Sequence, residues 1–257
     1  MRLSSLFIRV PTLFPMTWSI IARDDAGRFG IAIASRFLAV GALCAYTRRG
    51  VGAVATQALA NPLYGPAALD RLAAGEAPEA IVEALTQADA GRGQRQLHLI
   101  GAQGAGAVHT GGECIGWAGH HLGDGFSVAG NMLAGEAVVD ASAEAFREAA
   151  GKPLAERLLA ALAAGDAAGG DKRGKQAAAL RIQGDEDYAE LDLRVDDHAE
   201  PVVELQRLYI LSFQRLQPFL ACLPGRHDPD GVTDRQEIEA RIARFHADHG
   251  ITPEPGA

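Results

Sequence analysis

Residues 17–23 read Thr-Trp-Ser-Ile-Ile-Ala-Arg and residues 29–35 read Phe-Gly-Ile-Ala-Ile-Ala-Ser, and this pair of segments decides the fold. Two short runs rich in apolar and β-branched residues, separated by an Asp/Gly turn, are typical of a β-hairpin. The second run alternates small and large residues, as expected of a strand that is covered on one face and packed closely on the other. We expect residues 50–57 to form a third strand in the same antiparallel sheet.

The rest of the chain continues in blocks of helices and strands. Helices are predicted at 67–74 and 78–88, strands at 95–102, 106–110, 114–118 and 125–129, helices at 136–149 and 153–164, strands at 177–183 and 189–195, and a long amphipathic helix at 201–216. Strands that are segregated from paired helices favour an α+β fold. We therefore expect a four-layer αββα sandwich of two stacked antiparallel sheets with helices outside both.

Three parts are distinguished along the chain. Residues 1–15 form a leader or a non-native N-terminal extension, because Pro11 and Pro15 make the first apolar stretch a poor signal peptide. Residues 16–223 hold the sandwich. Residues 224–257 are interpreted as a linker and a helical appendage, with its helix at 234–249.

Composition limits the classes of partner. The chain has 257 residues and a formal net charge of −8, which disfavours nucleic acids and anionic membranes as partners. Cys44, Cys114 and Cys222 are far apart, so we expect reduced thiols and a cytoplasmic protein. Sheet edges and Ala-rich helices that need cover favour a homo-oligomer. No cofactor is expected, because the Gly-rich string at 101–106 lies between two strands and does not open a helix as phosphate-binding loops do.

Thr17 carries the chemistry that the sequence suggests first. A chain that begins at Thr17, after removal of the residues up to Met16, has a hydroxyl nucleophile and a free α-amine on one residue. An α-amine with an ordinary pKa of about 7.7–8.0 can accept the hydroxyl proton during attack on an amide. The alternative is an ordinary strand threonine, whose branched Cβ suits a pleated sheet.

A family resemblance rests on six segments in order. They are Thr-Trp-Ser-Ile-Ile-Ala-Arg-Asp (17–24), Gly-Ile-Ala-Ile-Ala-Ser-Arg-Phe-Leu-Ala-Val-Gly (30–41), Gly-Val-Gly-Ala-Val-Ala-Thr-Gln-Ala (50–58), Gly-Asn-Met-Leu-Ala-Gly (130–135), Ala-Gly-Gly-Asp-Lys-Arg-Gly-Lys-Gln (168–176) and Leu-Arg-Val-Asp-Asp-His (193–198). Over about residues 17–216 the chain resembles the uncharacterised DUF1028 family of the N-terminal nucleophile (Ntn) hydrolase superfamily, whose broader relatives include proteasome β-subunits.

The resemblance implies a set of catalytic residues. Thr17 stands at the position of the nucleophile and supplies the general base through its amine. Arg49 has the spacing of a cation that keeps the pKa of this amine low, Asn131 lies where the superfamily holds the amine or an oxyanion, and Asp171 begins the turn that closes the site. The alternatives are a surface ion pair for Arg49, a helix N-cap for Asn131 and an Asx turn for Asp171.

Further residues are implied as substrate-binding. They are Arg36, Gln57, Gly130 and Gly174, each of which lies in one of the six segments. Arg36 is also an alternative to Arg49 as the cation near the amine. The proteasome pattern has a carboxylate in the second strand, whereas this chain has Ile33 there, with Ser35 as the nearest polar group.

Two metal sites are weighed as alternatives, and no metal is assigned. The first set is Asp192, Arg194, Asp196, Asp197 and His198, whose carboxylates suit a divalent cation but also an exposed strand followed by a helix cap. The second set is His109, Cys114, His120 and His121, which lacks the close Cys pair of most zinc sites.

The sequence thus leads to two functional hypotheses. The first is an Ntn-type amidohydrolase that cleaves an amide bond of a small molecule or short peptide through Thr17. The second is a non-catalytic ligand-binding or assembly protein that keeps the same fold.

Overall fold

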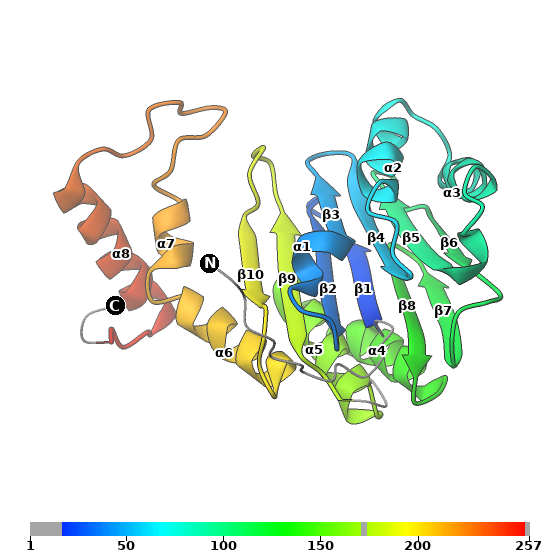
Figure 1. The fold of residues 1–257 in the computed structure, drawn as a ribbon. Helices are drawn as coiled ribbons and strands as arrows, with labels where there is room; N and C mark the ends of the chain where they lie inside the picture. Colours follow the sequence, from blue (N-terminus) through cyan, green and yellow to red (C-terminus); the bar gives the residue numbers. More distant parts are fainter. Residues whose placement is uncertain (1–16, 171–173, 255–257) are drawn as a thin grey trace, which may run out of the picture.

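Ten strands form two antiparallel sheets in the computed structural model, which describes residues 17–170 and 174–254 (Figure 1). The six-stranded sheet has the order β10-β9-β2-β1-β8-β7, and its strands are β1 (Thr17–Arg23), β2 (Phe29–Ser35), β7 (Trp117–Gly123), β8 (Phe126–Leu133), β9 (Ala177–Gln183) and β10 (Leu191–Val195). The four-stranded sheet has the order β3-β4-β5-β6, with β3 (Ala45–Arg48), β4 (Gly52–Ala58), β5 (Arg95–Gly101) and β6 (Gly106–Thr110).

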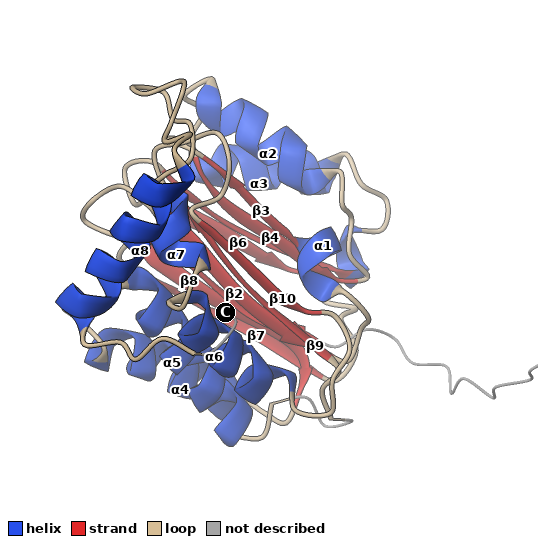
Figure 2. Ribbon diagram, turned by 90° about the vertical axis from the view of Figure 1, so that its left-hand side faces the viewer, coloured by secondary structure: helices blue, strands red, loops and turns tan. Residues whose placement is uncertain are grey.

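Helices cover the outer face of each sheet. On the six-stranded sheet lie α4 (Ala137–Glu148), α5 (Leu154–Ala167) and α6 (Pro201–Ser212), and on the four-stranded sheet lie α2 (Tyr64–Ala73) and α3 (Pro78–Gln87). Figure 2 shows the resulting order of layers, with the two sheets enclosed between the two groups of helices. The expected four-layer αββα sandwich of the α+β class is confirmed.

The hairpin of β1 and β2 lies at the centre of the larger sheet, and both strands have the bounds that the sequence predicts. Its turn is fixed by Asp24, whose backbone carbonyl accepts from the Gly27 N–H (3.0 Å) and whose carboxylate accepts from the Arg28 N–H (2.9 Å). Gly27 has a φ of +82°, a conformation that costs glycine little. Local turn chemistry therefore sets the register of the central strands.

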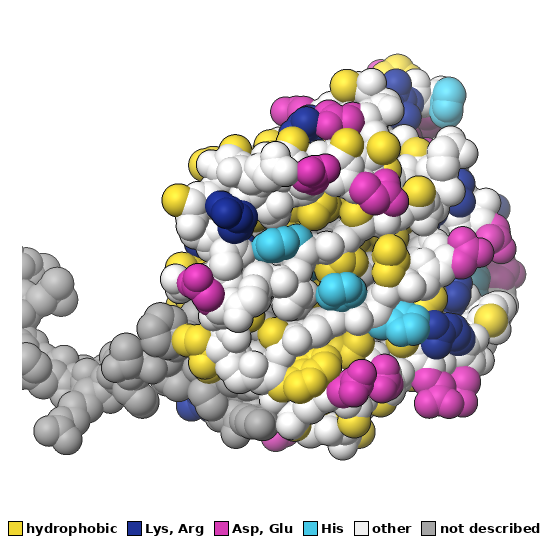
Figure 3. Space-filling model, turned by 90° about the vertical axis from the view of Figure 1, so that its right-hand side faces the viewer, with side chains coloured by type: hydrophobic (Ala, Val, Ile, Leu, Met, Phe, Trp, Pro, Cys, Tyr) yellow, Lys and Arg dark blue, Asp and Glu magenta, His cyan; other side chains and the backbone are white. Residues whose placement is uncertain are grey.

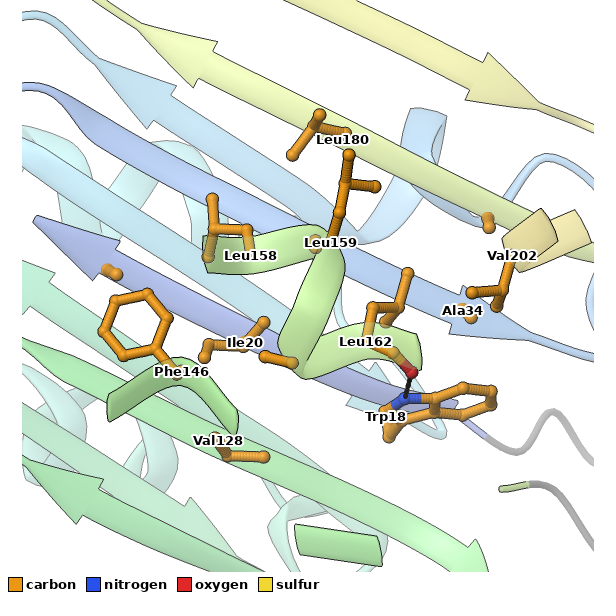
Figure 4. Close-up of a cluster of buried hydrophobic side chains, with 14 of the residues drawn as sticks. Trp18, Ile20, Ala34, Val128, Phe146, Leu158, Leu159, Leu162, Leu180 and Val202 are labelled. Atoms are coloured by element: carbon orange, nitrogen blue, oxygen red, sulfur yellow. Dashed lines mark hydrogen bonds between the residues drawn. The ribbon is translucent and has the colours of Figure 1, made fainter. Parts of the chain in front are cut away.

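Alternate residues of β1 face two different layers. Trp18 and Ile20 point to α5, where the Trp18 Nε1–H donates to the carbonyl of Leu162 at 3.4 Å (Figure 4). Gly165 of the same helix leaves room for the indole ring, since a Cβ there would lie 2.9 Å from Trp18 Nε1. Thr17, Ser19 and Ile21 face the other sheet instead. Both faces of β1 are buried, which explains its nearly continuous apolar sequence.

Apolar side chains fill one end of the layer between the sheets. This apolar end consists of Ile21, Phe29 and Ile31 from the larger sheet and Ala53, Ala55 and Ile100 from the smaller sheet. All six are at most 1% exposed. The small alanines of β4 allow the sheets to approach closely over the larger side chains of β2.

The structure corrects three expectations about the strands. The segment expected as the third strand is β4, which pairs with β3 and β5 in the other sheet and not with β1 or β2. The short helix α1 (Val40–Cys44) and β3 were not expected, because segments of four or five residues show no clear periodicity. β7 begins at Trp117 and not at residue 114, since its Gly-rich sequence does not define a boundary.

The helix expected at 201–216 ends at Ser212 as α6, and a separate short helix, α7 (Leu216–Leu220), begins where the expected helix would have ended. Beyond them α8 (Arg235–His249) begins after Asp234, whose carboxylate accepts from the Gln236 N–H at 2.8 Å, and ends at Gly250 with a φ of +62°. Phe245 of α8 stacks on Phe213 with a centroid distance of 6.4 Å, so the appendage packs against the end of α6. None of the helices in the described ranges has the length and apolar character needed to cross a membrane.

Candidate active site

Thr17 lies at the start of β1 with a polar neighbour on each side. The register pairs it with Ser35 of β2 and with Asn131 of β8. Thr17 Oγ1 donates to Ser35 Oγ at 3.1 Å, and Asn131 Nδ2 donates to the Thr17 carbonyl at 3.3 Å. All three side chains are at most 2% exposed. Two adjacent strands therefore fix both the hydroxyl and the main chain of Thr17.

Gln96 of β5 connects this strand end to the opposite sheet. Its Oε1 accepts from Gln57 Nε2 at 2.6 Å and from Asn131 Nδ2 at 3.3 Å. Its Nε2 donates to the carbonyl of Gly130 at 3.0 Å and to Thr110 Oγ1 at 2.9 Å. Gln96 is fully buried, so these bonds replace the water that its amide loses on folding.

His98 continues the network below Gln57. Ser19 Oγ donates its one proton to Gln57 Oε1 at 2.7 Å, so the contact of 2.8 Å between Ser19 Oγ and His98 Nε2 requires a proton on Nε2. His98 Nδ1 then accepts from Ser127 Oγ at 3.0 Å. Burial, with a smaller contribution from His120, lowers the pKa of His98 to about 3, which keeps the ring neutral.

We call this group the polar end of the inter-sheet layer. It consists of Thr17, Ser19, Ser35, Gln57, Gln96, His98, Ser127 and Asn131. Each of these side chains has a hydrogen-bond partner, and none of them carries a formal charge at neutral pH. These eight described residues therefore hold their groups in fixed positions but include no carboxylate or lysine that could act as a base.

Backbone strain marks both sides of the polar end. Ala58 follows Gln57 with a φ of +64°, and Met132 follows Asn131 with a φ of +53°. Non-glycine residues in this left-handed region are uncommon and gather at functional sites. Both residues line a recess of about 20 Å³ that also contacts Asn131, which is room for about one water molecule.

Arg36 and Gly174 lie together near the same strand end. Arg36 directly follows Ser35 and is exposed, and a Cβ on Gly174 would lie 3.1 Å from Arg36 Nη1. Gly174 has a φ of +89°, which favours glycine. Gly130 lies within β8, where its carbonyl accepts from Gln96, and Asn131 is a strand residue and not an N-cap because α4 begins only at Ala137. Asp171 lies outside the described residues.

The structure does not bring Arg49 to Thr17. Arg49 lies in the turn before β4, and its Nε donates to Asp187 Oδ1 at 3.3 Å. Arg49 lies just before Gly52, the first residue of β4. Gln57, which contacts Ser19, lies near the other end of this strand, about 16 Å from Gly52 along an extended chain. Arg49 thus belongs to the surface beyond the apolar end.

The segments of the sequence that meet at the polar end are also those that a family model covers. This model, described as a family of unknown function (DUF1028), matches residues 17–205. The chain belongs to the DUF1028 family. A crystal structure of a DUF1028 member, protein SPO2555 from Silicibacter pomeroyi, is similar with a TM-score of 0.78 and 30% identity over 85% of this chain and all of that one.

A second solved structure is much less similar to this DUF1028 chain. Anbu (ancestral beta-subunit) from Yersinia bercovieri matches with a TM-score of 0.37 and 13% identity, over 81% of this chain and 98% of that one. No curated protein matches the chain.

The two sets of possible metal ligands are not assembled in this DUF1028 chain. Among residues 17–170 and 174–254, no group of three or more His, Cys, Asp or Glu side chains could hold a metal ion. Asp196 is paired with Arg194 at 2.7 Å, and Asp197 accepts from Gln176 at 3.0 Å. Figure 3 shows histidines spread diagonally across the face formed by the β6 and β7 edges, and His120 bonds to Thr110 at 3.0 Å and not to a second histidine.

Sequence reasoning missed four residues of the polar end: Gln96 and His98 lie in the four-stranded sheet, and Ser19 and Ser127 lie in the six-stranded sheet. Of the residues that form the polar end, Thr17, Gln57 and Asn131 were expected in the site, and Ser35 was noted only as the polar group nearest to Ile33. The available signal was the alternation of polar Gln96 and His98 with apolar Leu97 and Leu99. This pattern usually indicates a strand with one solvent-exposed face, whereas here both faces are buried.

Proposed function

We propose that this DUF1028 protein is an Ntn-type amidohydrolase that cleaves an amide bond of a small molecule or short peptide through Thr17. The observation that carries the proposal is the position of Thr17 at the start of the central strand, with its hydroxyl held by Ser35 and its carbonyl held by Asn131. The family match that begins at Thr17 agrees with it. The residues before Thr17 must be removed for this activity.

The absence of a side-chain base in the described part of the site supports a role for the α-amine. Ser35 and Asn131 are the described hydrogen-bond partners of the Thr17 side chain and carbonyl, and neither side chain can act as a base at neutral pH. A free amine on Thr17 lies on the same residue as the hydroxyl and can take its proton. The nucleophile and the base are then positioned together by one strand.

The reaction proceeds in two steps. The amine of Thr17 accepts the Oγ1 proton while Oγ1 attacks the amide carbon, and the C–N bond breaks as that proton passes to the leaving amine. An ester between Thr17 and the acyl group remains. Water then attacks this ester with the same amine as base, which releases the carboxylic acid and restores the hydroxyl of Thr17.

Asn131 and Gln57 act as positioning residues in this proposal. Both hydrogens of Asn131 Nδ2 have acceptors, the Thr17 carbonyl and Gln96 Oε1, so this group is not available to an oxyanion without rearrangement. Gln57 is likewise bonded at both ends, to Ser19 and Gln96. Arg36 is the cation that replaces Arg49, because it follows Ser35 and can lower the amine pKa by charge repulsion.

The test is the intact mass of the purified protein together with labelling by an amide-directed acylating electrophile. We expect a chain that begins at Thr17 and carries one acyl group on it. Thr17→Ala loses the label, whereas the control Thr47→Ala, in β3 of the other sheet, keeps it. An unprocessed chain without a labelled threonine contradicts the proposal and favours the non-catalytic ligand-binding or assembly protein.

A further inference from the structure

A large cavity lies far from Thr17, between the sandwich and the C-terminal helices. Its volume is about 610 Å³, which is in the usual range for small-molecule sites. Its walls come from the start of α5, the β9–β10 connection, α6, α7 and the end of α8. Arg28, next to the β1–β2 turn, also lines it. This turn and Thr17 lie at opposite ends of β1, so the cavity is about 20 Å from Thr17, which is the length of the strand.

The cavity combines an apolar wall with the hydroxyl group of a largely buried tyrosine. Leu154, Ile182 and Leu191 supply aliphatic surface and are each at most 6% exposed. Tyr209 is 7% exposed, and its hydroxyl makes no hydrogen bond to another residue of the described ranges; because no fully buried side-chain polar atom of these ranges lacks a partner, the hydroxyl oxygen belongs to the accessible part of the residue. Burial raises the pKa of Tyr209 to about 12, so the hydroxyl stays protonated and can both donate and accept. The hydroxyl is therefore available to hydrogen-bond to a molecule in the cavity.

Charge around the cavity is mainly negative. Four carboxylates line it, those of Glu156, Asp185, Glu186 and Glu190, against the guanidinium group of Arg28. Arg28 is already neutralised by Asp24 (2.8 Å) and Glu190 (3.2 Å). Glu156 and Asp185 are in no ion pair within the described residues, so an incoming cation finds a favourable field.

Aromatic rings complete this environment. Tyr209 and Phe213 both line the cavity, and their rings pack edge to face with a centroid distance of 5.2 Å. Aromatic rings attract organic cations, above all where carboxylates lie nearby and water is excluded. The four carboxylates would repel an anion, and a neutral polar molecule would gain a hydrogen bond from them but no charge attraction.

We propose that this cavity binds an organic ammonium compound with an apolar body. The body packs on the aliphatic wall, and the ammonium group lies between Tyr209 and the carboxylate of Glu156. The site is separate from Thr17 and does not depend on the proposed hydrolase activity.

The test is isothermal titration calorimetry on the full chain with four probes of similar size: benzylammonium, benzyltrimethylammonium, benzyl alcohol and benzoate. We expect both ammonium probes to bind, the alcohol to bind roughly tenfold more weakly and benzoate not to bind at millimolar concentration. Equal affinity for the alcohol and the ammonium probes, or no binding of any probe, would overturn the proposal.

Amino-acid substitutions test whether the ammonium probes bind in this cavity. Glu156→Gln should weaken both ammonium probes about fivefold to tenfold, whereas Glu144→Gln, an exposed carboxylate on α4, should leave them unchanged. Tyr209→Phe should weaken benzylammonium and spare benzyltrimethylammonium, which has no N–H to donate. Ala221→Phe, at an exposed lining position, should block both. Undiminished binding in Glu156→Gln and Ala221→Phe would exclude this cavity as the site.

Discussion

The two ends of the layer between the sheets are built from the same strands but from opposite chemistry. At the apolar end, side chains such as Ile31 and Ile100 pack without a polar atom, whereas at the polar end Thr17 and Gln96 belong to a continuous hydrogen-bonded group. An unpaired buried polar group costs about 1–3 kcal/mol, so a polar interior is stable only when it is fully satisfied. The comparison teaches that apolar packing dominates at one end and that hydrogen bonds constrain geometry at the other, which is why the proposed site is the polar end.

The largest loss of stability is expected from a substitution at the apolar end. Phe29→Ala removes a ring that is 1% exposed, and we expect the free energy of unfolding to fall by about 3–5 kcal/mol because a cavity remains between the sheets. Chemical denaturation measures the loss. Phe29→Leu, which retains most of the volume, should lose clearly less. Equal losses in the two variants would show that cavity formation is not the cause.

Replacing Gln96 tests whether the hydrogen bonds of the polar end contribute to stability. Gln96→Leu keeps the size of the side chain but leaves the donors of Gln57 and Asn131 without their acceptor, and we expect a loss of about 2–3 kcal/mol. The matched control is Gln87→Leu on the exposed surface of α3, which should be nearly neutral. If Gln96→Leu were neutral too, the satisfied network would not contribute to stability.

His98 makes the polar end sensitive to acid. The unfolded chain protonates this histidine near its ordinary pKa of about 6.5, whereas the folded chain does so only near a pKa of about 3. The unfolded state therefore binds more protons between these values, and stability falls by about 1.4 kcal/mol per pH unit as the pH drops through this window. The measurement is denaturation at several pH values. His98→Gln should remove this contribution, and an unchanged pH slope in that variant would contradict the assignment.

The smallest loss of stability is expected from a substitution of Arg49, on the surface beyond the apolar end. Arg49→Ala breaks an exposed pair with Asp187, which should cost less than about 1 kcal/mol. Acyl labelling of Thr17 should not change, whereas Arg36→Ala should slow it because the amine loses its neighbouring cation. A loss of labelling in Arg49→Ala would contradict the separation of the two ends.

Much of the fold could be predicted because local chemistry sets it. The turn at Asp24 defines β1 and β2, and Asp234 and Gly250 delimit α8 by capping. The pairing of β4 with β5 could not be predicted, since the same alternation of residues fits either sheet. The residues of the site likewise fall into those that the sequence could predict and those that it could not. Gln57 and Asn131 stand in recognisable segments, whereas Gln96 acquires its role only when the sheets stack, and the distance of Arg49 from Thr17 depends on the direction of β4.

The long sequence separation between β1 and β8 also shapes how the molecule forms. Thr17 and Asn131, which pair in the finished sheet, are 114 residues apart. At the usual rates of protein synthesis β8 leaves the ribosome roughly ten seconds after β1. During this interval the β1–β2 hairpin can form but lacks its neighbours on both sides, since β9 is made later still. Pairing around Thr17 therefore has to wait for β8, and until then the nascent hairpin presents two unpaired apolar edges that other chains or chaperones can contact.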